Sequence, residues 1–100
     1  MLKLTTRSSW MEFRDALAAE EDFRTSGALR GTGERYSHTR GQLPSEYWDS
    51  LRDAQYVVYS YATPIAWRTQ CQWHAPAVRY SVTTSRHQGT IFTAIAELLR

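Results

Sequence analysis

A cluster of hydroxyl, guanidinium, imidazole and amide side chains near the end of the sequence has the residue types that bind anions. Its members follow one another without a gap: Thr84, Ser85, Arg86, His87 and Gln88. The pattern around them predicts a helix that begins here, and the first turn of a helix carries free N–H groups and a positive dipole end. With an arginine added, such a turn binds phosphate or carboxylate. A structural interpretation stays open, because Ser85 and Gln88 also have the spacing of a capping box.

The histidines raise two further kinds of chemistry. Cys71 and His74 have the spacing of a pair of zinc ligands, but structural zinc sites usually show two such pairs and this sequence has one. His74 and His87 would act as acid and base on a phosphodiester only if the fold brought both imidazoles to one phosphate. The sequence contains no glycine-rich phosphate loop and no nucleophile elbow. We therefore expect no metal and no cofactor, and favour a protein that is not an enzyme.

A second polar segment, residues 25–42, holds four glycines with serine, threonine and arginine between them. A connection this long within a compact domain is often functional. Four of its side chains have the chemistry to grip a nucleic-acid backbone and stack on a base, namely Arg30, Arg35, Tyr36 and Arg40. The alternative is a solvated loop with one short strand at residues 28–30.

The composition is that of one globular domain, residues 1–100. The hydrophobic fraction of 42% and the charged fraction of 22% suit a chain with a single core and argue against disorder. A formal net charge of +2 is too small to indicate nucleic-acid binding by itself. Cys71 is the one cysteine, which excludes an internal disulfide. No stretch is apolar enough for a membrane span or an export signal, so we expect a cytoplasmic protein with no membrane partner.

The N-terminal helical segment, residues 1–24, is predicted to contain a short edge strand over residues 1–6 and then a helix. Ser9 and Glu12 form a capping box, and good helix formers continue through Asp22. Apolar residues at helical spacing give this helix one buried stripe, made of Trp10, Phe13 and Leu17.

The remaining segment, residues 43–100, is predicted to begin with a short helix from Pro44 to about Asp53, because proline suits the first turn. Apolar runs then predict strands at residues 56–61, 65–69 and 72–74. Pro64 should break the first from the second, since it removes a ladder donor. A hairpin turn between the second and third would bring Trp67 and Trp73 close across the ladder.

The last part of the chain predicts one more strand and a helix. Val78, Tyr80 and Val82 alternate with polar residues, as in a strand with one buried face. The following helix, which begins at Ser85, carries an apolar stripe of Ile91, Ala94, Ile95 and Leu98.

These elements indicate an α+β fold. We expect a small antiparallel sheet of three to four strands, packed on one face by the N- and C-terminal helices, with the Pro44 helix over an edge or one end. The tyrosines and tryptophans of the strands are assigned to the core, because a chain with 13% aromatic residues needs them there to bury enough area.

Two sequence words resemble a known family. They are residues 56–67 (YVVYSYATPIAW) and residues 80–88 (YSVTTSRHQ), with Trp73, Pro76 and the stretches around Gly27 and Leu43 in the same pattern. The chain is similar to small proteins of unknown function from actinobacteria and their bacteriophages. The likeness covers residues 27–98 and leaves the first helix outside. It implies a cytoplasmic accessory protein of bacterial or phage origin, and implies no site residue.

The function that these observations favour is binding without catalysis. We expect a small accessory protein that contacts a host macromolecule, with a host protein preferred over nucleic acid. The alternative is a nucleic-acid or nucleotide-binding module that uses the Arg/Gly segment and the polar start of the last helix. A phosphodiesterase centred on His74 and His87 is a third hypothesis, which requires those two side chains to meet.

Overall fold

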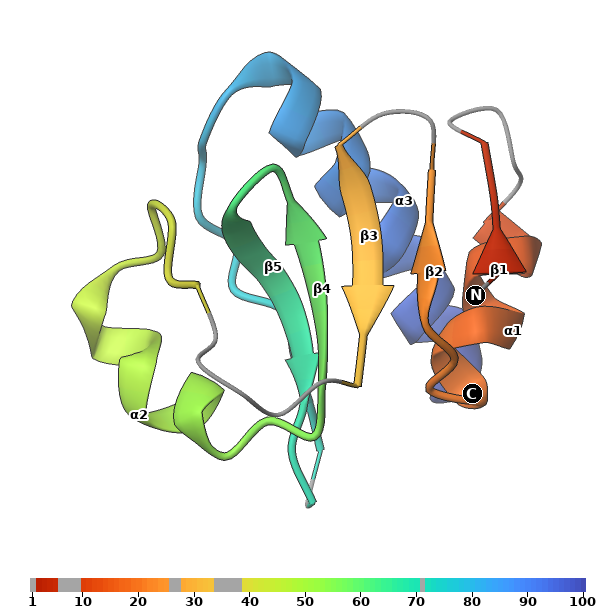
Figure 1. The fold of residues 1–100 in the computed structure, drawn as a ribbon, viewed down its shortest axis with the longest axis horizontal. Coiled ribbons are helices and arrows are strands. Elements are labelled where there is room, and N and C mark those ends of the chain that lie inside the picture. The colour runs from red at the N-terminus through yellow and green to blue at the C-terminus, as the bar shows by residue number, and fades with distance from the viewer. Residues whose placement is uncertain (1, 6–9, 26–27, 34–38, 71) are drawn as a thin grey trace.

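A computed structural model describes residues 2–5, 10–25, 28–33, 39–70 and 72–100 of the protein. Within these ranges six strands form one sheet, in the order in which they occur in the chain (Figure 1). The strands are β1 (Leu2–Lys3), β2 (Phe23–Arg24), β3 (Leu29–Thr32), β4 (Tyr56–Ser60), β5 (Thr63–Arg68) and β6 (Trp73–His74). The helices are α1 (Trp10–Ala18), a single 3₁₀ turn (Ser45–Tyr47), α2 (Trp48–Arg52) and α3 (Val82–Leu98).

The expected α+β class is confirmed, but the expected sheet is wrong in size and in direction. The sheet is mixed, because β1 pairs in parallel with β2 while the other neighbours pair antiparallel. Parallel neighbours need a crossover connection, and α1 lies in the connection between β1 and β2. The strand at β2 has two residues, too few to show any alternation, which is why the sequence pattern missed it.

Helix α1 ends four residues before the predicted limit at Asp22, and the reason is local. The amide of Glu21 donates to the carbonyl of Ala16 at 2.9 Å, and the amide of Glu20 donates to Leu17 at 3.1 Å. Glu20 itself has a φ of 49°, in the left-handed region. This pair of bonds is a Schellman motif, which ends a helix and reverses the chain. The reversal makes room for β2 beside β1.

The sheet separates two apolar layers, since successive residues of a strand point to opposite faces. Helices α1 and α3 pack together and cover one face, where Leu29, Tyr56 and Val58 are buried (Figure 1). The short α2 covers part of the other face, where it buries Leu51 against Val57, Tyr59 and Trp67. The expectation that the Pro44 helix lies over an edge or an end is therefore corrected: it lies on a face.

The β4–β5 hairpin is the centre of the molecule. Five consecutive residues of β4 are buried, which confirms the assignment to the core for Tyr56 and Tyr59, whereas Tyr61 just after the strand is exposed. Pro64 lies within β5 and pairs with Tyr59 next to a register shift, so the expected break at this proline is a bulge. Trp67 pairs with His74, which leaves Trp73 on the opposite face against Tyr56. The predicted contact between Trp67 and Trp73 is wrong by one residue of register.

Candidate functional site

The polar cluster at the start of α3 lies one turn further into the helix than its sequence predicts. Ser81 is the N-cap, and its hydroxyl accepts from the Thr84 amide at 3.1 Å. The capping box predicted at Ser85 and Gln88 is therefore wrong. The strand expected over residues 78–82 is also absent, because Val82 already belongs to the helix and the Gln88 amide donates to the carbonyl of Val78 at 2.9 Å. That bond holds the preceding chain alongside the first turns.

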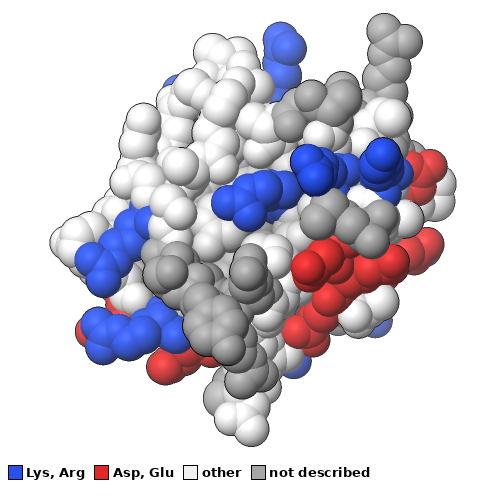
Figure 2. Space-filling view, in the orientation of Figure 1, with Lys and Arg blue, Asp and Glu red and all other residues white. Residues whose placement is uncertain are grey.

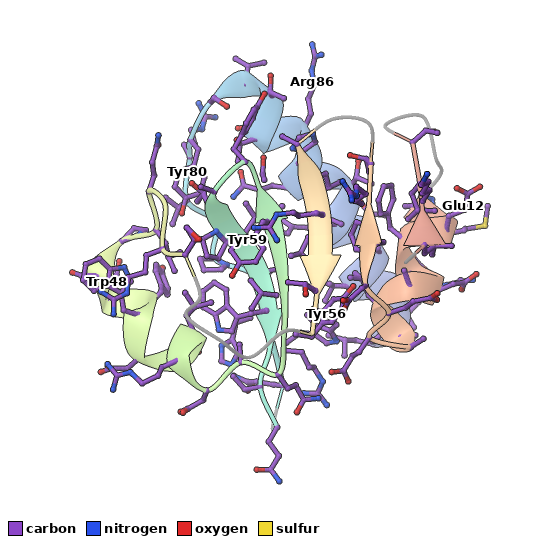
Figure 3. The ribbon with its side chains drawn as sticks, in the orientation of Figure 1. Glu12, Trp48, Tyr56, Tyr59, Tyr80 and Arg86 are labelled. Atoms are coloured by element: carbon purple, nitrogen blue, oxygen red, sulfur yellow. The ribbon has the colours of Figure 1, made fainter. Side chains whose placement is uncertain are left out.

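The earlier helix start divides the cluster between core and solvent. Thr84 and Gln88 are buried, at 4% and 6% exposure, since they fall on the same helix side as Ile91 and Ile95. Ser85 and Arg86 are exposed, and Arg86 points away from the molecule (Figure 3). His87 lies between these groups and is half-buried. The five residues therefore do not form one anion site at a helix end.

A buried hydroxyl network fixes His87 against the end of β4. Nδ1 of His87 lies 2.7 Å from Oγ of Ser60, and Ser60 donates to Oγ1 of Thr84 at 3.1 Å. Ser60 is completely buried. A serine beside a histidine suggests a nucleophile with its base, but this hydroxyl has no surface that a substrate can reach. The pair instead ties the hairpin to α3, with Nδ1–H donating to Ser60 when Ser60 donates to Thr84.

Burial lowers the pKa of His87, because it disfavours the charged imidazolium. An unfolded histidine titrates near pH 6.5. As the pH falls through that value, the unfolded chain takes up the proton before the native state does, so the free energy of unfolding decreases. Above that value His87 is neutral in both states and this loss of stability is absent. We expect the urea concentration at the unfolding midpoint to decrease when the pH is lowered from about 7.5 to about 5.5.

The matched variant for this prediction is His87→Asn, whose amide can still bond Ser60 but cannot be protonated. Its urea midpoint should fall less over the same pH interval. His74→Asn serves as a second comparison, because burial and Arg68 lower the pKa of His74 in the same direction. A decline in His87→Asn that equals the wild-type decline would show that His87 does not contribute.

The exposed part of the cluster joins the turn between β4 and β5. The ring of Tyr61, at this turn, lies 6.4 Å from the ring of His87, and its amide donates to Ala28 at 3.0 Å. A hollow of about 340 Å³ opens beside His87, with Phe13 and Leu29 among its lining residues. We use the name hairpin–helix surface for three residues that line this hollow, Thr83, Arg86 and His87, together with Tyr61 beside His87 and the exposed Val82 at the start of α3.

Tyr61 is a residue that sequence reasoning assigned to a core strand. Its side chain is 58% exposed, and its φ of 58° lies in the left-handed region, where a tyrosine is strained and a glycine is not. The residues on either side of Tyr61, within residues 56–67, include no glycine or asparagine, so the sequence shows no turn signal at this position. Strain of this kind costs about 1 to 3 kcal/mol and is found mostly at functional positions.

The structure does not bring His74 to His87. His74 belongs to β6, where its ring stacks on Trp67 at 5.7 Å and Nε2 lies 3.1 Å from the hydroxyl of Thr69. His87 instead contacts Ser60, at the opposite end of the β4–β5 hairpin. Two imidazoles that far apart along the sheet cannot act on one phosphate. The phosphodiesterase hypothesis requires the two side chains to meet, and this requirement is not fulfilled.

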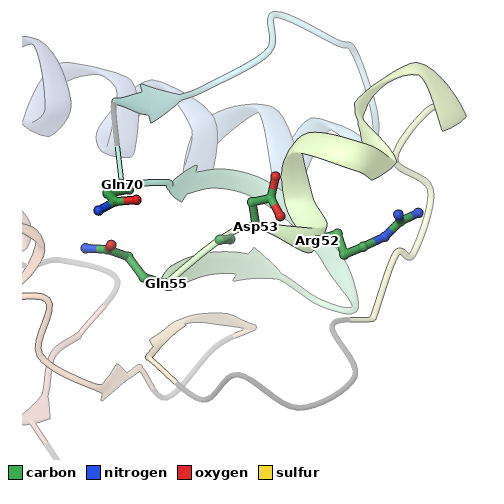
Figure 4. A pocket seen from close by; sticks show the side chains of 5 residues that line it. Arg52, Asp53, Gln55 and Gln70 are labelled. Carbon is green, nitrogen blue, oxygen red and sulfur yellow. The ribbon is translucent and has the colours of Figure 1, made fainter.

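Two adjoining hollows lie near His74, between the end of α2 and the turn after β5. One, of about 470 Å³, is lined by Arg52, Asp53, Ala54, Gln55 and Gln70, and its side chains diverge (Figure 4). The Gln55 amide is already bonded to Glu20 at 2.7 Å. The other, of about 520 Å³, includes Ser50, Asp53 and His74. In it, the Ser50 hydroxyl accepts from the Trp67 indole and Nε2 of His74 lies beside the Thr69 hydroxyl, so both side chains are held by neighbours.

The arginines that the sequence predicts to share one nucleic-acid contact lie against different parts of the molecule. Arg30, in β3, lies over the ring of Tyr59 at 4.2 Å, and Arg40 lies over the ring of Trp48 at 4.3 Å. Both are exposed. Arg35 and Tyr36 lie outside the described residues, as does Cys71. Within the described ranges no three His, Cys, Asp or Glu side chains come together as metal ligands.

Comparison with known proteins adds a family and no activity. Among the described residues, no helix combines the length and apolar character that crossing a membrane requires. No curated protein and no solved structure matches the chain. A family model described as "Family of unknown function (DUF8033)" matches residues 5–97, a range that includes α1, which the sequence words had left outside. The match spans almost the whole chain, and the protein belongs to this family of unknown function.

Proposed function

We propose that the protein is a non-enzymatic accessory protein that binds a host protein through the hairpin–helix surface. The single observation that carries the proposal is Tyr61, an aromatic side chain that a left-handed backbone holds out into solvent. A glycine would relieve that backbone, so folding alone does not account for a tyrosine. Tyrosine and arginine are the side chains that dominate binding energy at protein interfaces.

The surroundings of Tyr61 support a protein partner over nucleic acid. Val82 is 73% exposed at the first turn of α3, and Arg86 follows it at i+4 on the same helix side. The hollow that Arg86 lines has an apolar floor in Phe13 and Leu29, and Arg86 is the one arginine among its lining residues. An apolar recess with an aromatic and a single cation suits a partner side chain better than a row of phosphates.

The setting that we propose is the cytoplasm of an actinobacterium, with the protein encoded by a phage or by the cell. The test places the photo-crosslinking residue p-benzoylphenylalanine at Tyr61 and illuminates the protein in an actinobacterial lysate. The control places the same residue at Met11, which is 49% exposed on α1. We expect a discrete protein adduct from position 61 that nuclease treatment does not remove, and none from position 11. An adduct lost with nuclease would instead favour the nucleic-acid alternative.

Tyr61→Gly should separate binding from stability. Loss of the ring should weaken capture of the crosslinked partner about tenfold or more, as for a central interface aromatic. The melting temperature should stay the same or rise by a few degrees, because glycine relieves the left-handed backbone and this gain offsets its greater unfolded-state entropy. Arg86→Ala should weaken the same interaction. Unchanged capture by both variants would remove the hairpin–helix surface from the proposal.

A further inference from the structure

Three cations stand side by side across the face of the sheet that α2 leaves open. The ladder pairs Lys3 with Arg24 and Arg24 with Arg30, so the three residues occupy one row on adjacent strands. Their neighbours Leu2, Phe23 and Leu29 belong to the layer under α1 and α3. Because alternate residues face opposite sides, the three cations share the other face. All three are exposed. We call Lys3, Arg24 and Arg30 the basic row.

The surface view shows the same arrangement. A band of Lys and Arg crosses the face over β3, β2 and β1, and Asp and Glu gather on one side of it (Figure 2). The acidic side includes Glu21 and Asp22, which precede β2, and Asp22 is held in place by the amide of Gly33 at 2.8 Å. The band therefore has a sharp border on that side, where a polyanion is repelled.

Like charges directly opposite on neighbouring strands destabilise a sheet. The basic row places three such charges in sequence, about 5 Å apart from strand to strand. An anion that binds across the row lowers this repulsion. The span of two strand spacings, about 10 Å, is enough for more than one phosphate of a nucleic-acid strand.

Arg30 offers a stacking surface, which a nucleic-acid base can use and inorganic phosphate cannot. Its guanidinium lies over the buried ring of Tyr59 at 4.2 Å, so a cation–π contact holds it against the sheet. Bases of single-stranded nucleic acid stack on guanidinium planes as they do on aromatic rings. One end of the row thus offers a stacking surface, while Arg24 and Lys3 continue as charges for the backbone.

The geometry points to a binding site for single-stranded nucleic acid on the basic row, separate from the hairpin–helix surface. The site uses Arg30 for a base and a phosphate, and Arg24 and Lys3 for the phosphates that follow. It places the nucleic acid on the sheet face, and not at the helix start where Arg86 lies.

The test measures fluorescence anisotropy of labelled oligothymidine and oligouridine of about 12 nucleotides, from about 50 mM to about 200 mM salt. Three phosphate contacts predict a slope of log affinity against log salt of about −2, so binding should weaken roughly 20-fold over this range. The triple variant Lys3→Gln, Arg24→Gln, Arg30→Gln should bring the slope close to zero. Arg52→Gln, on α2, and Arg86→Gln should leave it unchanged.

Several results would overturn the inference. They are a triple variant that binds like wild type, a loss of binding in Arg86→Gln, equal binding of polyglutamate, or tighter binding of a duplex of the same length. Equal binding of polyglutamate would mark an acidic protein as the partner. Circular dichroism melts of each variant check folding, and the oligonucleotide should raise the melting temperature of wild type, Arg52→Gln and Arg86→Gln but not that of the triple variant. If the triple variant does not fold, Arg30→Gln alone should still reduce the slope by about 0.7.

Discussion

Trp67→Ala is expected to remove about 3 to 5 kcal/mol of stability, the largest loss that a single truncation should cause in this protein. The indole is completely buried in the layer under α2. Its N–H donates to Oγ of Ser50 at 2.9 Å, its face stacks on His74, and Tyr47 meets it edge to face at 6.3 Å. Truncation removes all three contacts and opens a cavity between the sheet and α2.

A domain of this size has about 5 to 15 kcal/mol of total stability, so the variant should melt at least about 10 °C below wild type. Urea unfolding followed by circular dichroism measures the difference. Trp67→Phe is the comparison, because it keeps an aromatic ring and loses only the indole N–H and part of the volume. If Trp67→Ala melted within 2 or 3 °C (on the order of the error) of wild type, α2 would not be anchored by this side chain.

Gly41→Ala should destabilise the protein by about 2 to 5 kcal/mol, although the change adds one methyl group. Gly41 has a φ of 50°, which is strained for any residue with a Cβ. A Cβ there would also press on the carbonyl of Ala62 and lie 2.6 Å from Cα of Thr63. Backbone atoms cannot rotate away as a side chain can, so the hairpin turn would have to move.

The matched control is the same substitution at Gly89, in the exposed middle of α3. A Cβ at Gly89 meets nothing within 4 Å. Alanine is the better helix former, so Gly89→Ala should stabilise by about 1 kcal/mol. Thermal melts of the two variants should therefore shift in opposite directions. A downward shift of Gly89→Ala, or none in Gly41→Ala, would contradict this account of the two glycines.

The parts of the fold that the sequence predicted are those with a long periodic signal. Ile91, Ala94 and Ile95 repeat at helical spacing, and they form the buried side of α3. The apolar run of β4 is buried on both faces, as a central strand is. By contrast, β1 and β2 have two residues each, and they pair only because the connection through α1 brings them side by side. No local pattern predicts such a pair.

The candidate site was half predictable, for a related reason. Thr84 and Gln88 were assigned to a contact surface because they are polar, yet both lie at helical spacing from Ile91 and point inward with it. That spacing was visible in the sequence and predicts that both residues lie on the buried side of the helix. Polar side chains can be buried there because the Thr84 hydroxyl bonds Ser60 and the Gln88 amide bonds Val78. The position of Tyr61 depends on a turn with no glycine, and the basic row depends on strand pairing.

The chain has a single lysine, and it lies in β1 at the outer end of the basic row. Reagents that acylate amines will therefore find one side-chain target in the whole protein. A dye attached by this route would report on events at that edge of the sheet. A sensor chip loaded by the same chemistry would hold the molecule by the face that we assign to nucleic acid, while the exposed Tyr61 and Arg86 belong to the other surface.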